Sequence, residues 1–251
     1  MTEIVLDSFQ NCSRLRKFEI PKNSNLKKIN GRSSYLIGFE SLWLPSSVVE
    51  LSEGWCHEVP NLNDIKIDTD NKRYKLINDD KFIVGKASIE SNDFDELVFC
   101  VRKGVKTAVI PFCIKNIQKF AFMNSSIETL SISPHLTKIG EAAFSSCKKL
   151  NKVLIPQNSQ LCELGYKAFA YTKIVSFIIP PKVYGINEAF FDCEKLRFVE
   201  ISENAKMKML FVESFQYCDN VILFIPCNLI NIILDKDSIC PPLIRPKHTK
   251  S

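Results

Sequence analysis

The strongest constraint on this chain of 251 residues is a short apolar signature that recurs along most of its length. An apolar residue is followed by a second one three positions later and by a third two positions after that, and this occurs nine times. Of these 27 positions only Asn220 is not apolar, although apolar residues make up 45% of the chain. The nine signatures end at Ile20, Leu44, Ile67, Ile110, Ile132, Ile155, Ile179, Ile201 and Ile225.

The spacing between these end residues is nearly constant. The steps are 24, 23, 43, 22, 23, 24, 22 and 24 residues, so one step is about twice the others. A period of this size is typical of solenoids, in which each unit stacks only on its neighbours. We therefore expect one continuous repeat array over residues 1–234, followed by a C-terminal tail over 235–251.

Each unit has the same internal order. The signature ends in an alternating, β-branched segment such as residues 153–155, which predicts a short strand. A proline such as Pro156 usually follows and ends the strand. Gly140 and Gly165 mark a second bend, where a close turn favours a residue without Cβ. A helical turn with an inward aromatic ring is then expected at five phenylalanines, which are Phe122, Phe144, Phe169, Phe190 and Phe215.

The step of 43 residues contains additional sequence. Residues 69–104 hold two apolar runs, 82–84 and 97–100, with a polar stretch between them. This arrangement predicts a hairpin-type insertion that projects from the solenoid.

The cysteines follow the repeat rather than a metal or disulfide pattern. Of ten cysteines, four lie three residues after an in-phase phenylalanine, which predicts packing thiols; these are Cys12, Cys147, Cys193 and Cys218. We expect the last three to be buried and free. The others show no paired spacing, there is no CxxC, and the chain has three histidines. We therefore expect no metal site and no cofactor.

At this point the chain resembles a known family. Residues 143–156 read A-F-x-x-C-x-x-L-x-x-V-x-I-P, which is similar to the BspA-like leucine-rich repeat. The resemblance covers residues 9 to about 226, and the segment from Asn71 to Pro111 resembles that family's N-x-x-Y-K insertion. It implies a leucine-rich-repeat solenoid, a right-handed superhelix of short parallel β-strands with helical or 3-10 turns on the convex side. It also implies cell-surface adhesion, with a host matrix or cell-surface protein as the partner.

Other functional classes lack their motifs. The net charge of +5 is spread along the chain without a basic run, so nucleic-acid binding is not expected. There is no phosphate-binding loop and no G-x-S-x-G, so we expect a protein without enzymatic activity. No signal peptide and no membrane-spanning segment are expected, which favours a cytoplasmic chain or a fragment. An intracellular, non-enzymatic scaffold therefore stays open beside the adhesion module, and the oligomeric state is not indicated.

The outward residues of the strands are the candidate binding surface. Because side chains alternate, the residue before each signature end should point outward. These residues are Glu19, Trp43, Lys66, Val109, Ser131, Leu154, Ile178, Glu200 and Phe224. The apolar ones are explained either by the strand preference for such residues on both faces or by a partner-binding strip. The strip would consist of Leu154, Ile178 and Phe224 with Lys152 and Arg197 beside them.

Overall fold

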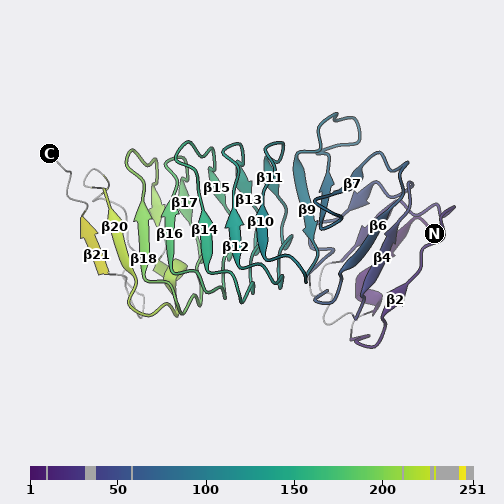
Figure 1. Ribbon diagram of the computed structural model, residues 1–251, viewed down its shortest axis with the longest axis horizontal. Coiled ribbons are helices and arrows are strands. Elements are labelled where there is room, and N and C mark those ends of the chain that lie inside the picture. The colour runs from purple at the N-terminus through teal and green to yellow at the C-terminus, as the bar shows by residue number, and fades with distance from the viewer. Residues whose placement is uncertain are drawn as a thin grey trace.

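The protein is an elongated β-solenoid in the computed structural model, which describes residues 1–9, 11–31, 38–57, 59–210, 212–226, 229 and 243–246. Strand β2 (Lys17–Phe18) lies near one end of the long axis and β21 (Leu243–Pro246) lies near the other (Figure 1). The units follow one another along this axis in sequence order. The successive units therefore make one long surface.

The nine signature segments form the first wall. Their strands are β2, β4 (Ser41–Leu44), β6 (Asp64–Ile67), β10 (Thr107–Val109), β12 (Thr129–Ser131), β14 (Lys152–Leu154), β16 (Ser176–Ile179), β18 (Phe198–Ile201) and β20 (Ile222–Ile225). Within the described residues they pair in parallel in three groups, β2–β4–β6, β10–β12–β14 and β16–β18–β20. We call the outer surface of these strands the strand face.

The register follows the signature. Ala108 lies opposite Leu130, which lies opposite Val153, and each is the middle residue of its signature. Within each of the three groups the predicted parallel pairing is confirmed. The three groups are separate sheets. Among the described residues β6 does not pair with β10, and β14 lies next to β16 but belongs to another sheet.

Shorter strands form a second wall. They are β1 (Glu3–Val5), β3 (Lys28–Asn30), β5 (Glu50–Leu51), β11 (Asn116–Ile117), β13 (Lys138–Ile139), β15 (Glu163–Leu164), β17 (Gly185–Ile186) and β19 (Met209–Leu210). Next to this wall Gly165 packs against the preceding unit, where a Cβ would lie 2.5 Å from the backbone nitrogen of Glu141. The expected need for a residue without Cβ is confirmed at this bend.

The third corner carries the in-phase phenylalanine in those units that have one. This corner is a 3-10 helix at η1 (Leu6–Phe9) and at η2 (Val212–Phe215), and a series of turns around Phe122, Phe144, Phe169 and Phe190. In these turns the residues two before and two after the phenylalanine have positive φ, as at Lys167 (52°) and Tyr171 (60°) around Phe169. A right-handed helix needs negative φ throughout, so these corners do not form the expected helical turn.

The phenylalanine rings stack through the centre of the solenoid. The ring centroids of Phe144 and Phe169 lie 5.1 Å apart, and those of Phe169 and Phe190 lie 6.1 Å apart. Phe144, Phe169 and Phe190 are each 0% exposed. The predicted buried column is confirmed.

The insertion does not project from the solenoid. Strand β8 (Phe82–Gly85) pairs in antiparallel fashion with β7 (Tyr74–Ile77) on one side and with β9 (Glu96–Cys100) on the other, and β9 pairs in parallel with β11 of the second wall. Figure 1 shows β7 and β9 inside the array, between β6 and β10. The predicted hairpin is confirmed, since β8 and β9 pair in antiparallel fashion, but its strands do not project because residues 82–84 and 97–100 are apolar on both faces and are buried.

One buried charge joins the insertion to the next unit. The side chain of Arg102 is 2% exposed and stacks on the ring of Phe99, with 4.3 Å between the guanidinium carbon and the ring centroid. Its guanidinium donates hydrogen bonds to the carbonyl oxygens of Cys56 (2.9 Å) and Ala121 (3.0 Å). Arg102 thus bridges the units on either side of the long step, and it was not predicted from the sequence.

Two further expectations concern the cysteines and the tail. Cys147, Cys193 and Cys218 are buried and free, as predicted, whereas Cys12 is exposed. Cys12 belongs to the first unit, so no earlier unit in the described chain covers it. Within the expected tail, β21 adds a fourth parallel strand beside β20. Cys227 and Cys240 lie outside the described residues.

Candidate binding surface

The C-terminal half of the strand face exposes a row of apolar side chains. Leu154 is 44% exposed and Ile178 is 49% exposed, while Phe177, the residue before Ile178, is 2% exposed. The alternation of the strand therefore holds, with one side chain in the core and the next in water. The predicted outward direction of Leu154 and Ile178 is confirmed.

The register extends this row across three strands. Ile178 of β16 lies opposite Glu200 of β18, and Glu200 lies opposite Phe224 of β20. Strand β14, which carries Leu154, lies beside β16 (Figure 1). The structure thus places the three predicted apolar residues on one continuous surface.

A fourth apolar residue on this surface was missed by the sequence analysis. Phe198 is 46% exposed, and its ring stacks with that of Phe224 at a centroid distance of 6.4 Å. It lies two residues before Glu200 and therefore on the same face of β18. The sequence analysis used one outward position in each strand, and the position two residues earlier would have identified Phe198. We call Leu154, Ile178, Phe198 and Phe224 the apolar strip.

The two basic residues assigned to the rim differ in their surroundings. Lys152 is exposed on β14, beside Leu154. Arg197 is half-buried, and its Nη1 donates hydrogen bonds to the carbonyl oxygens of Glu194 (2.9 Å) and Asp219 (2.9 Å). Arg197 therefore holds two neighbouring turns together at the edge of the strip.

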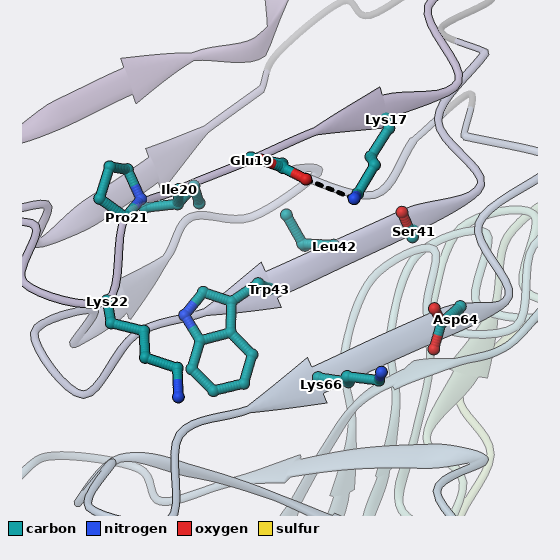
Figure 2. A pocket seen from close by; sticks show the side chains of 10 residues that line it. All are labelled: Lys17, Glu19, Ile20, Pro21, Lys22, Ser41, Leu42, Trp43, Asp64 and Lys66. Carbon is teal, nitrogen blue, oxygen red and sulfur yellow. Dashed lines mark ion pairs between the residues drawn. The ribbon is translucent and has the colours of Figure 1, made fainter.

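The N-terminal half of the strand face is different, because it is hollowed around Trp43. A groove of about 590 Å³ lies over β2, β4 and β6, and Figure 2 shows the Trp43 indole, which lines it, with Lys22 on one side and Lys66 on the other. A second hollow of about 610 Å³ continues toward β7 and shares these three residues. We call the first hollow, lined also by Ser41 and Asp64, the Trp43 groove.

The charged side chains of the Trp43 groove differ in whether they form ion pairs. At its edge, Lys17 and Glu19 form an ion pair, and the hydrogen bond from Lys17 lowers the pKa of Glu19. Within the part of the chain that the structure describes, the ammonium groups of Lys22 and Lys66 form no ion pair. The Lys22 ammonium lies 5.5 Å from the centroid of the Trp43 ring.

The described residues show no arrangement typical of an enzyme. No three His, Cys, Asp or Glu side chains among them lie close enough to hold a metal ion. Burial raises the pKa of the Cys147 thiol to about 11, which keeps this thiol protonated and unreactive near neutral pH. No helix among the described residues has the length and apolar character required to cross a membrane.

Parallel strands at a period near 23 residues, with a stacked phenylalanine column, define a leucine-rich-repeat solenoid. Six copies of the BspA type leucine rich repeat region match residues 1–98 and 115–236. The chain belongs to this family. A comparison with curated protein sequences gives no match.

Three of the solved structures with the same fold come from bacteria. The TM-score is 0.71 for a leucine-rich repeat protein of Eubacterium ventriosum (19% identity) and 0.71 for a leucine rich cell surface protein of Faecalibacterium prausnitzii (20% identity). The alignments cover 84% and 88% of this chain but 56% and 62% of those proteins. The pneumococcal vaccine antigen PcpA has a TM-score of 0.74 at 17% identity, with 99% of this chain and 68% of PcpA aligned.

Proposed function

We propose that this chain is a non-enzymatic binding module that holds a protein partner on the apolar strip. The observation that carries the proposal is the exposure of Leu154, Ile178 and Phe198 on adjacent strands of one wall of the solenoid. Contiguous exposed apolar side chains are typical of interaction sites, and solenoid walls offer extended surfaces for them.

The composition of the strip fits a protein interface. Aromatic and aliphatic anchors at the centre of an interface supply most of its binding free energy, and polar side chains surround them. Here Phe198 and Phe224 provide the aromatic anchors, and Lys152 and Arg197 lie at the edge of the strip. An adhesion role toward a matrix or cell-surface protein is supported by the likeness to a bacterial cell surface protein.

A second candidate is an intracellular scaffold that uses the same surface. It is favoured by the cysteines, since the eight in the described part of the chain are all free. Reduced thiols are typical of reducing compartments. Staining of unpermeabilised cells separates the two candidates, because an adhesion module must be accessible from outside and a scaffold must not.

The proposed function is tested with a charged variant of the strip. Leu154→Glu/Ile178→Glu should keep the fold, since both side chains point to water, and should weaken binding to an immobilised matrix protein by at least about tenfold. Phe112→Glu/Tyr184→Glu is the matched control, because it places the same two charges on exposed apolar positions outside the strand face. Equal binding by the wild type and both folded variants would contradict the proposal.

A further inference from the structure

We propose that the Trp43 groove is a second binding site, separate from the apolar strip, and that it takes an acidic sugar, a sugar ring that carries one carboxylate. The site combines an aromatic ring, two ammonium groups that form no ion pair with any described residue, and nearby oxygen acceptors within one hollow (Figure 2). Each of these features corresponds to one part of such a ligand.

The first feature is the indole of Trp43. It stands on the outward side of β4, where its neighbours Leu42 and Leu44 are buried in the core. Its Nε1 is buried and donates to no acceptor among the described residues, whereas buried Trp N–H groups usually find a partner. Figure 2 shows the Lys22 side chain running along the nitrogen side of the indole. A ligand oxygen that displaced this flexible side chain would give the N–H its missing acceptor.

The second feature is the local charge. Lys22 and Lys66 flank the indole, and neither forms an ion pair within the described ranges of the chain. Both are exposed, so their ammonium groups can reach a bound anion. A carboxylate placed beside the ring would receive charge-assisted hydrogen bonds from one or both of them.

The third feature limits the ligand to one negative charge. Glu19 and Asp64 also line the groove; Glu19 is paired with Lys17, and the carboxylate of Asp64 would repel a polyanion such as a nucleic acid or an acidic peptide segment. The same carboxylates and the Ser41 hydroxyl accept hydrogen bonds from hydroxyl groups. A ligand that is rich in hydroxyls and carries a single charge satisfies both conditions.

The size of the groove is consistent with this class. A hollow of about 590 Å³ lies within the range of roughly 300–1,000 Å³ that is usual for small-ligand sites. The adjoining hollow of about 610 Å³ toward β7 leaves room for a second sugar unit. The ring of Trp43 forms part of the wall of both hollows, so it would contact both units.

The test compares two sugars that differ in one group. D-glucuronic acid and D-glucose share the same ring, and only the former carries a carboxylate. Titration calorimetry and saturation-transfer NMR on the full chain should show glucuronic acid binding at least tenfold more tightly than glucose. Indole fluorescence should change on binding in the wild type and not in Trp43→Phe, since the other tryptophan, Trp55, is buried in the core.

Variants then assign the effect to the groove. Lys22→Gln/Lys66→Gln should weaken glucuronic acid binding about tenfold, to the level of glucose, and both side chains are exposed, so the fold should be kept. Lys148→Gln/Lys149→Gln removes two exposed lysines elsewhere and should bind like the wild type. Leu154→Glu/Ile178→Glu should also bind the sugar normally, which separates this site from the apolar strip.

Three results would overturn the proposal. The first is equal binding of glucuronic acid and glucose by the wild type. The second is a loss of binding in the Lys148/Lys149 variant as large as in the Lys22/Lys66 variant, which would indicate general attraction of anions. The third is binding of poly-L-glutamate in preference to glucuronic acid, which would indicate an acidic peptide instead.

Discussion

The thiol of Cys193 donates a hydrogen bond to the carbonyl oxygen of Phe169, 3.1 Å away and one unit earlier in the solenoid. Cys147 makes the same bond to Phe122 (3.0 Å), and Cys218 makes it to Phe190 (3.0 Å). Each of these thiols therefore links the corner of its own unit to that of the preceding one. The repeated cysteine is a structural feature of the stacked units rather than a reactive group.

This arrangement predicts which thiols react. Iodoacetamide should label Cys12, Cys113 and Cys162, which are exposed, within minutes in the native protein. Cys147 and Cys193 should stay unlabelled until the chain is unfolded, because they are buried and the raised pKa of Cys147 leaves little thiolate. Mass spectrometry of the labelled peptides gives the result. Rapid native labelling of either buried thiol would contradict the packing.

The same thiol gives a pH dependence of stability. The pKa of Cys147 is about 11 in the folded chain, above the ordinary value of 9.0. Between these two values the unfolded chain loses the proton while the folded chain keeps it, so the free energy of unfolding falls as the pH rises. The slope is at most about 1.4 kcal/mol per pH unit.

Cys147→Ser is the matched variant for this prediction, because Ser125 occupies the same position one unit earlier. The variant should lose less stability than the wild type between pH 9 and 10.5, as measured by urea unfolding. Below pH 8 the two proteins should show the same pH dependence. Parallel curves over the whole range would show that Cys147 is not responsible.

The sequence analysis predicted the features that repeat from unit to unit and missed features that occur in one unit. The strands and the phenylalanine column repeat in phase, so each copy supports the interpretation of the others, and the register of Leu130 and Val153 followed from spacing. Arg102 has no counterpart in other units, and its partners are backbone carbonyls at Cys56 and Ala121, far away in sequence. No side-chain pattern encodes such a contact.

The same limit applies to the binding surface. The outward direction of Leu154 follows from alternation within one strand. The hollow around Trp43 depends on how β2, β4 and β6 lie together with the loop that carries Lys22, which spacing does not determine. Positive φ at corner residues such as Tyr171 was also hidden, since glycine does not mark these positions.

The aromatic column predicts a large loss of stability for one truncation. Phe169→Ala should lower the free energy of unfolding by about 3–5 kcal/mol, because the ring is fully buried and stacked against two others. Phe112→Ala serves as the control, since this ring is 71% exposed, and should change stability by less than about 0.5 kcal/mol. Similar urea midpoints for the two variants would contradict the column.

The hydrogen bonds of the buried Arg102 predict a second loss of stability, with a different cause. Arg102→Met removes the guanidinium and leaves the buried carbonyl oxygen of Cys56 without its donor, so stability should fall by about 2–3 kcal/mol. Arg102→Lys keeps the charge and one possible donor and should cost less. Lys103→Met, at the exposed neighbouring position, should have little effect in the same urea titration. An Arg102→Met protein as stable as the wild type would refute the bridging role.

The most direct test of the proposed function is hydroxyl-radical footprinting of the folded chain, alone and bound to a matrix protein that it retains. We predict that Leu154, Ile178, Phe198 and Phe224 become several-fold less reactive in the complex, because the partner covers the apolar strip. Phe112 and Tyr217, which are exposed outside the strand face, should react equally in both states. Protection of Phe112 or Tyr217, with the strip as reactive as in the free chain, would contradict the account.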